Sequence, residues 1–277
     1  MKLTLGFSPC PNDTFIFDAM IHGRVDTEDI EFDYFLADVE ELNSKAKSAE
    51  VDITKISFHA YCHVAAKYIM LDSGSALGFG AGPLLIGKPG IDINSIASKK
   101  IAIPGKYTTA NLLFGIAWPE CRNKKEYLFS DIEEAIINGE VDAGLIIHET
   151  RFTYQKRGLV KIADMGEYWE QLVNLPVPLG TIVIKRTIPE NTALKVNRIL
   201  KRSLEYAIST PKASLDFVAG NAQAMDIDVM NSHINLYVNE FTLSLGSKGR
   251  AAIKKLFGMA TDKKLIPHLP NRIFLVQ

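Results

Sequence analysis

The sequence has few cysteines, no surplus of charge of either sign and no long apolar run. Its three cysteines show no Cys-x-x-Cys spacing, which argues against a disulfide framework and favours a reducing compartment. Thirty-one basic residues against 32 acidic ones give a net charge of −1, which argues against a nucleic-acid-binding protein. No apolar stretch approaches the roughly 20 residues of a membrane span, and the N-terminal run is too short for a signal peptide. We therefore expect a cytoplasmic protein without membrane insertion.

The sequence also lacks the glycine-rich motifs of nucleotide-binding proteins. No Gly-x-Gly-x-x-Gly follows the first predicted strand, so nothing indicates a dinucleotide site. Residues 82–88 have the glycine and lysine spacing of a phosphate-binding loop, but Pro89 stands where Ser or Thr would hold magnesium. Because the residues between the glycines are mostly apolar, we interpret this segment as a strand.

Short apolar strands alternate with helical patterns in two successive series. This order predicts an α/β protein whose sheets have helical crossovers. The first series has strands at 3–7, 30–36 and 53–56, with helices that begin near 15, 38 and 57. The second series has strands at 100–103, 125–128 and 143–147 and helices at 109–117 and 130–138, and a strand at 181–185 precedes a mostly helical stretch from 188 to about 259.

Two sequence echoes suggest how the two series are arranged. Ala-Glu-Val-Asp at 49–52 and Gly-Glu-Val-Asp at 139–142 each end a helix and begin a strand, and the strands stop at Ser57 and His148. Two further apolar strands, at 84–88 and 181–185, flank the second series. The echoes can also arise by chance in a chain rich in Val, Ile and Glu.

The arrangement predicts two α/β lobes, the second inserted into the first, with a cleft between them. Residues 1–88 and 184–277 would form a large discontinuous lobe, and residues 89–183 a smaller inserted lobe. Clefts between lobes are common places for ligand sites.

His148 is the most informative single residue, because it follows the buried strand at 143–147. Ligands of open α/β sheets gather at the carboxyl ends of strands. An imidazole, with an unperturbed pKa near ~6.5, suits a general base near neutral pH. A histidine in this place can instead cap a helix start, and position alone does not decide between the two roles.

Polar residues at two predicted helix starts are candidate carboxylate ligands. Thr108, Thr109 and Ala110 open a helix after a strand and a loop, where hydroxyls and unpaired backbone N–H groups bind anions. Ser57 occupies the matching helix start in the other lobe. Helix capping explains the same residues, and capping and ligand binding are compatible.

The cysteines and the other histidines give weaker evidence about function than His148 does. His59, Cys62 and His63 lie on one short helix, but Cys62 cannot easily join both histidines in tetrahedral geometry, so we interpret them as polar core residues and expect no metal. Cys10 stands between two prolines in the loop after the first strand. It can be a nucleophile or a structural residue, and the sequence assigns it no base.

Three motifs make the chain resemble a known enzyme family. They are Gly-Phe-Ser-Pro-Cys-Pro-Asn-Asp-Thr-Phe at 6–15, Ile-His-Glu-Thr-Arg-Phe-Thr-Tyr at 147–154 and Leu-Tyr-Val-Asn-Glu-Phe-Thr at 236–242. Because they lie at the beginning, middle and end, the whole chain is similar to the 1,4-dihydroxy-6-naphthoate synthases of the futalosine route to menaquinone. This resemblance implies a two-lobed fold like that of the type II periplasmic binding proteins, with a central cleft.

The resemblance also implies an activity and a set of site residues. The family converts cyclic dehypoxanthine futalosine to 1,4-dihydroxy-6-naphthoate, a lyase reaction without a cofactor that releases a three-carbon sugar fragment. The expected partner is therefore a small-molecule carboxylate substrate. Two alternatives stay open: the chorismate dehydratase of the same pathway, and a non-catalytic solute-binding protein.

The resemblance also implies roles for individual residues. His148 would be the proton acceptor. The substrate-binding residues would be Lys55, Ile56, Ser57, Thr109 and Ala110, and Asn12, Thr108 and Arg151 complete the candidate set.

Overall fold

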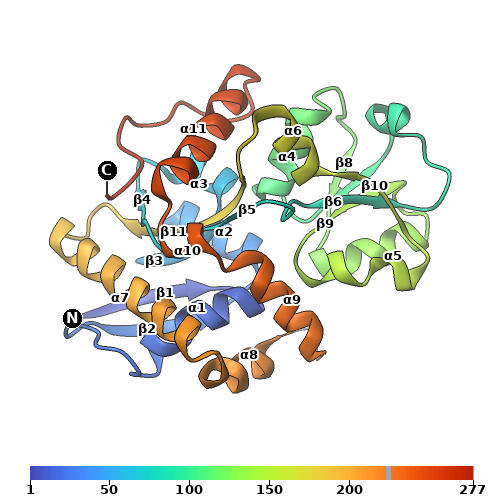
Figure 1. Cartoon of the computed structure of the whole chain (residues 1–277). Coiled ribbons are helices and arrows are strands. Elements are labelled where there is room, and N and C mark those ends of the chain that lie inside the picture. The colour runs from blue at the N-terminus through green and yellow to red at the C-terminus, as the bar shows by residue number, and fades with distance from the viewer. Residues whose placement is uncertain (223–225, 277) are drawn as a thin grey trace.

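Two sheets with the same strand order form the framework of the protein (Figure 1). The computed structural model describes residues 1–222 and 226–276. In each sheet, three parallel strands are followed by an antiparallel fourth strand and by a fifth that is antiparallel to the fourth. The first sheet has the order β2 (Glu31–Leu36), β1 (Lys2–Phe7), β3 (Ile53–Ser57), β11 (Val177–Lys185) and β4 (Tyr68–Met70), and β5 (Ala76–Gly78) also pairs with β11. The second has the order β8 (Lys124–Glu126), β7 (Ile101–Ile103), β9 (Ala143–Ile146), β6 (Leu84–Gly87) and β10 (Val160–Asp164).

The strand pairing differs from the predicted lobe boundaries at 88/89 and 183/184 at two strands. Strand β6 pairs with β9 in the second sheet, although the sequence assigned it to the first lobe. Strand β11 pairs with β3 in the first sheet, although most of it was assigned to the inserted lobe. An apolar run predicts a strand but carries no information about which distant strand it pairs with. We propose that the chain passes between the lobes in the β5–β6 connection and again just before β11.

A proline or a side-chain cap accounts for the start of three of the helices, although the first of them begins four residues before the predicted position near 15. Helix α1 (Pro11–Ile21) starts with a proline, which suits a position whose N–H group has no helical partner. The Asp38 carboxylate accepts a hydrogen bond of 2.8 Å from Glu40 N and caps α2 (Val39–Ser48), as expected. Thr108 caps α4 (Thr109–Ala117), and this helix has the bounds predicted from the sequence. The other helices are α3 (Phe58–Val64), α5 (Ile132–Ile137), α6 (Met165–Val173), α7 (Glu190–Ser209), α8 (Leu215–Asn221), α9 (Ile227–Tyr237), α10 (Glu240–Leu243) and α11 (Gly246–Asp262).

Short 3₁₀ segments and short strands account for most elements absent from the sequence prediction. Strands β4 and β5 have three residues each, too few for a periodic pattern. The 3₁₀ segments are η1 (Ile93–Ser98), η2 (Phe129–Asp131), η3 (His148–Phe152), η4 (Tyr154–Arg157) and η5 (Pro211–Ser214). In the part of the chain that the structure describes, no helix has the length and apolar character needed to cross a bilayer.

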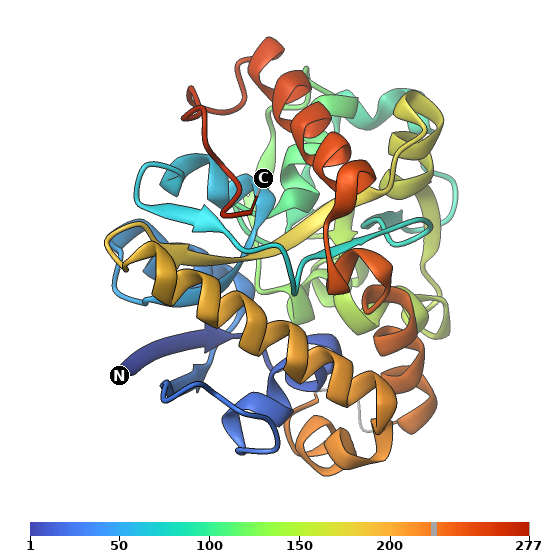
Figure 2. The same ribbon diagram turned by 60° about the vertical axis from the view of Figure 1, so that its left-hand side comes forward.

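Apolar packing joins the two sheets on one side. One core contains Ile56 of β3, Leu145 of β9, Phe114 of α4 and Leu256 of α11, all fully or almost fully buried. Removing a side chain of this size from water contributes about 1.5–3 kcal/mol. A separate core lies between the first sheet and α1 and α7, and Figure 2 shows α7 running along that sheet. The shared core holds the lobes together, and the functional side chains gather at the strand ends.

Candidate functional site

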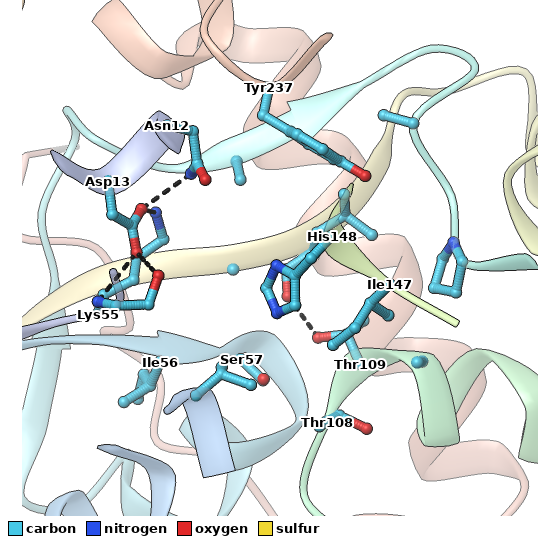
Figure 3. A pocket seen from close by; sticks show the side chains of 18 of the residues that line it. Asn12, Asp13, Lys55, Ile56, Ser57, Thr108, Thr109, Ile147, His148 and Tyr237 are labelled. Atoms are coloured by element: carbon cyan, nitrogen blue, oxygen red, sulfur yellow. Dashed lines mark hydrogen bonds and ion pairs between the residues drawn. The ribbon is translucent and has the colours of Figure 1, made fainter. Parts of the chain in front are cut away.

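A cavity lies between the two sheets, next to the carboxyl ends of β1, β3 and β9 (Figure 3). The space open to the centres of water molecules is about 100 Å³. Both lobes contribute to its wall, as the sequence echoes predicted. Of the predicted site residues, Asn12, Lys55, Ile56, Ser57, Thr108, Thr109, Ala110 and His148 line this cavity.

His148 stands at the start of η3, two residues beyond the end of β9. Its backbone has a φ of 58°, a left-handed conformation that is uncommon for a residue with a side chain. The imidazole contacts the Phe129 ring edge-on, with 4.9 Å between the ring centroids. Its Nδ1 lies 3.2 Å from Cys10 Sγ. Two neighbouring side chains therefore hold the ring while it borders the cavity.

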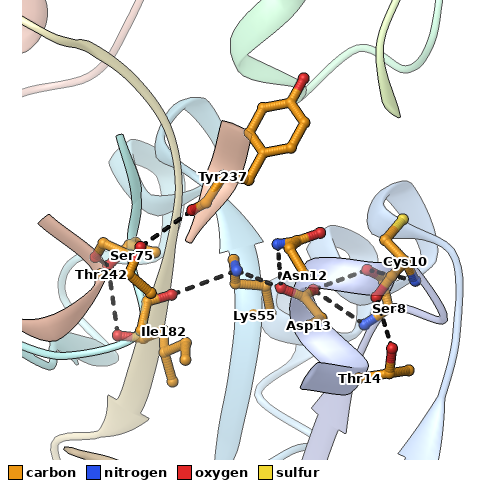
Figure 4. A network of polar contacts seen from close by, with 12 residues as sticks. Ser8, Cys10, Asn12, Asp13, Thr14, Lys55, Ser75, Ile182, Tyr237 and Thr242 are labelled. Carbon is orange, nitrogen blue, oxygen red and sulfur yellow. Dashed lines mark hydrogen bonds and ion pairs between the residues drawn. The ribbon is translucent and has the colours of Figure 1, made fainter. Parts of the chain in front are cut away.

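A buried ion pair forms one end of the cavity (Figure 4). Lys55 Nζ lies 2.5 Å from Asp13 Oδ1, and the two side chains are 7% and 3% exposed. Ser8 Oγ donates to Asp13 Oδ2 at 2.8 Å, and Asn12 Nδ2 donates to Oδ1 at 2.9 Å. The lysine charge is thus neutralised within the protein.

His233 extends this network from α9. Its Nε2 lies 3.0 Å from Asn12 Oδ1, and the side chain is almost completely buried. Burial, with smaller effects of His148 and Lys55, holds the pKa of His233 well below its usual value. A neutral imidazole therefore donates Nε2–H to the Asn12 amide oxygen. Tyr237 follows one turn later on α9, and Figure 3 shows its ring on the side of the cavity opposite Ser57 and Thr108.

The start of α4 offers backbone N–H groups to a ligand. The Thr109 hydroxyl donates to Leu179 O at 2.5 Å, and the Thr108 hydroxyl donates to Gly105 O at 2.8 Å. The hydroxyl donors expected for a carboxylate are thus used within the protein. The N–H groups of Thr109 and Ala110 belong to the first helical turn, which has no internal acceptor and binds anions well.

Asn43 orients Ser57 through two hydrogen bonds. Asn43 Nδ2 donates to Ser57 Oγ at 3.3 Å, while Asn43 Oδ1 accepts from Ser57 N. Asn43 also donates to Glu40, whose other oxygen accepts from Tyr107 N of the opposite lobe at 3.3 Å. Burial is the main cause that raises the pKa of Glu40. These hydrogen bonds connect the orientation of Ser57 to the contact between the lobes.

Arg151 is the one predicted site residue that does not line this cavity. It is absent from the cavity wall, because its guanidinium donates to Gly82 O and, at 2.9 Å, to Gly80 O. It also pairs with Asp164 at 3.5 Å. The 3₁₀ turn after His148 directs Arg151 toward the β5–β6 connection, which the sequence did not reveal. The geometry gives it a role in holding this connection, and the connection carries the cavity residues Ala81 and Pro83.

The His59 cluster is a contact between helices. His59 Nδ1 lies 3.2 Å from Thr108 O, Cys62 Sγ contacts Phe58 O, and His63 is exposed. Burial raises the pKa of the Cys62 thiol, which keeps it protonated. Among the residues described, no group of three or more His, Cys, Asp or Glu side chains could hold a metal ion.

Protonation of His59 should destabilise the protein at acidic pH. Burial lowers the pKa of His59 from 6.5 to about 4, so the unfolded state binds more protons between these values and stability falls as the pH drops. The variant His59→Asn retains a donor near the Nδ1 position. We expect it to reduce the fall in the free energy of unfolding between pH 7 and pH 4 by about 3 kcal/mol. Urea unfolding at pH 4 to 7 measures it. The exposed His268→Asn is the control and should keep the wild-type slope; an equally steep slope in His59→Asn would contradict the assignment.

Comparison with known proteins decides the family. A family model described as menaquinone biosynthesis matches residues 3–262. The chain belongs to this family. A Thermus thermophilus relative, named 1,4-dihydroxy-6-naphthoate synthase, is 39% identical over 273 residues, which are 99% of each chain. A Streptomyces coelicolor relative of the same name is 40% identical over 273 residues, 96% of this chain and 95% of its own. The family predicted from the three motifs is confirmed.

Solved structures confirm the predicted fold of this menaquinone-biosynthesis protein. A crystal structure of an Archaeoglobus fulgidus protein has a TM-score of 0.90 at 37% identity and covers 96% of this chain and 98% of its own. The periplasmic aliphatic sulphonate binding protein from Escherichia coli has a TM-score of 0.66 at 13% identity, covering 99% of this chain and 92% of its own. The second likeness shows the fold alone.

Three titratable side chains of the cavity wall, those of Asp13, His233 and Tyr237, were not among the predicted site residues. Asp13 lies in the first family motif, but its partner Lys55 is 42 residues away in the sequence. Tyr237 lies in the third family motif, and its spacing of four from His233 places both on one face of α9. The motif was therefore a usable signal for Tyr237, whereas nothing local links His233 to Asn12, 221 residues earlier.

Proposed function

We propose that this protein is a cytoplasmic 1,4-dihydroxy-6-naphthoate synthase, a carbon–carbon lyase that acts on cyclic dehypoxanthine futalosine with His148 as the proton acceptor. The observation that carries the proposal is the position of His148, which borders the same cavity as Ser57 and the first turn of α4. The names of the two full-length relatives support the same reaction.

The cavity suggests how each group acts. The N–H groups of Thr109 and Ala110 and the Ser57 hydroxyl hold the substrate carboxylate. Apolar side chains such as Val39 and Leu179 contact the ring system. His148 removes a hydroxyl proton and the oxygen forms a carbonyl as the adjacent carbon–carbon bond breaks. The electron pair of that bond enters the retained ring, which becomes aromatic, and His148 returns the proton to the product. Aromatisation supplies driving force, so the protein mainly positions the substrate and moves one proton.

A side-by-side assay tests the proposed function against the two alternatives. The purified protein is incubated separately with cyclic dehypoxanthine futalosine and with chorismate, and the products are followed by liquid chromatography and mass spectrometry. We expect release of 1,4-dihydroxy-6-naphthoate from the first compound, no change in the second, and full activity after dialysis against EDTA. Dehydration of chorismate would favour the dehydratase. A ligand that binds but stays chemically unchanged would favour a solute-binding protein, which the same fold also serves.

A further inference from the structure

A second cavity lies behind the His148 ring. It shares Ser8, Val39 and His148 with the substrate cavity, but Cys10 and Phe129 line only this rear cavity. The space open to water centres is about 170 Å³. His148 therefore borders both cavities, and its Nδ1 atom contacts Cys10, which lines only the rear one.

The backbone around Cys10 is held firmly. Prolines precede and follow it, and its carbonyl accepts from Thr14 N at 3.0 Å and from Thr14 Oγ1 at 3.1 Å. Cys10 N lies 3.4 Å from Ser8 Oγ, whose hydroxyl is bound to Asp13 (Figure 4). A thiol on such a rigid segment, itself 5% exposed, has little freedom to leave the imidazole.

We propose that Cys10 is a positioning residue for His148, an inference that rests on the function proposed above. The ring donates Nδ1–H to Cys10 Sγ, and this bond selects the tautomer in which Nε2 carries the lone pair. A neutral imidazole has one donor and one acceptor nitrogen, so the partner of one nitrogen determines the role of the other. In the reaction, Nε2 gains the substrate proton, Nδ1 keeps its own, and the thiol is neither consumed nor oxidised.

The proposal explains why a cysteine stands between two prolines at this strand end. Sulfur is a weak hydrogen-bond acceptor, and a thiol held at a fixed place can orient the ring through Nδ1–H. The edge-on contact with Phe129 limits rotation of the ring about the same position. Together they direct Nε2 toward the chamber lined by Ser57 and Thr109.

The first test is the tautomer of His148, which needs no substrate. Nitrogen-15 NMR of the ring should show a protonated Nδ1 and an unprotonated Nε2 in the wild type. In Cys10→Ala this signature should be lost in favour of the commoner Nε2–H form, and Cys10→Ser should restore part of it. Cys121→Ala removes a buried thiol of the other lobe and should leave the His148 signals unchanged. An identical His148 tautomer in wild type, Cys10→Ala and Cys10→Ser would overturn the proposal.

The second test is steady-state turnover of the same variants. Loss of one hydrogen bond that orients the base should lower kcat about 3- to 10-fold with KM little changed. If Cys10→Ala does not fold, Cys10→Ser provides both readouts. A changed tautomer in a protein that turns over neither pathway substrate would refute the proposed function and leave the Cys10 role standing. Unchanged kcat and an unchanged tautomer in an active enzyme would refute the Cys10 role alone.

Discussion

Replacing His148 with Asn should lower kcat by about 10²- to 10⁴-fold, because general base catalysis contributes an effect of this size. Asparagine keeps a polar group near the Nδ1 position and has a smaller volume, so the left-handed backbone at this residue and the contact with Cys10 can persist. We therefore expect thermal stability close to wild type and product binding within a few-fold of wild type.

The experiment measures turnover of cyclic dehypoxanthine futalosine and, separately, the affinity for 1,4-dihydroxy-6-naphthoate by calorimetry. His268→Asn changes an exposed histidine outside the substrate cavity and should retain full activity. Near-native turnover in His148→Asn would remove this residue from the mechanism. Loss of both turnover and product affinity would assign it to binding.

Replacing Asp13 with Asn should destabilise the protein by about 3–5 kcal/mol, because it leaves the Lys55 ammonium buried without a counter-charge. The two side chains are 3% and 7% exposed, so solvent does not screen the charge that remains. The double variant Asp13→Asn/Lys55→Met removes both charges and should recover much of this loss. Urea unfolding of the wild type, the two single variants and the double variant gives the coupling energy directly.

A pair on the protein surface supplies the control. Lys45 and Glu41 are 3.5 Å apart on α2 but 33% and 57% exposed, so Glu41→Gln should cost no more than about 1 kcal/mol. If Asp13→Asn were as mild as this control, the Asp13–Lys55 pair would not be desolvated in solution. Such a result would reopen the question of whether Lys55 presents a free charge to the substrate.

Local patterns in the sequence were sufficient for many of the helices and strands and for part of the cavity wall. Thr108 as an N-cap, followed by apolar residues at helical spacing, predicts helix α4 with its observed bounds. Apolar strands that stop at polar residues place Ser57 and His148 at strand ends, and the structure brings both to one cavity. These features depend on a few neighbouring residues, so a single sequence is enough to predict them.

Features that depend on distant pairing were not predictable in this way. The residues of β6 are equally apolar in either sheet, and only their pairing with β9 assigns them to the second. The direction of Arg151 follows from the turn after His148 and from carbonyl groups about 70 residues away. In each case the deciding contact joins residues that are far apart in the sequence, and hydrophobic periodicity does not predict such contacts.

The place of β11 in the first sheet has a consequence for the order of folding. β11 lies between β3 and β4, yet in the chain it comes after all strands of the second sheet, which lie between Leu84 and Asp164. On a ribosome, the second sheet can therefore pair completely while the first still lacks an inner strand. Long-range pairing of this kind is slow, because a long loop must close before the contacts form. We expect the inserted sheet to gain protection from hydrogen exchange earlier during refolding than β3 and β4.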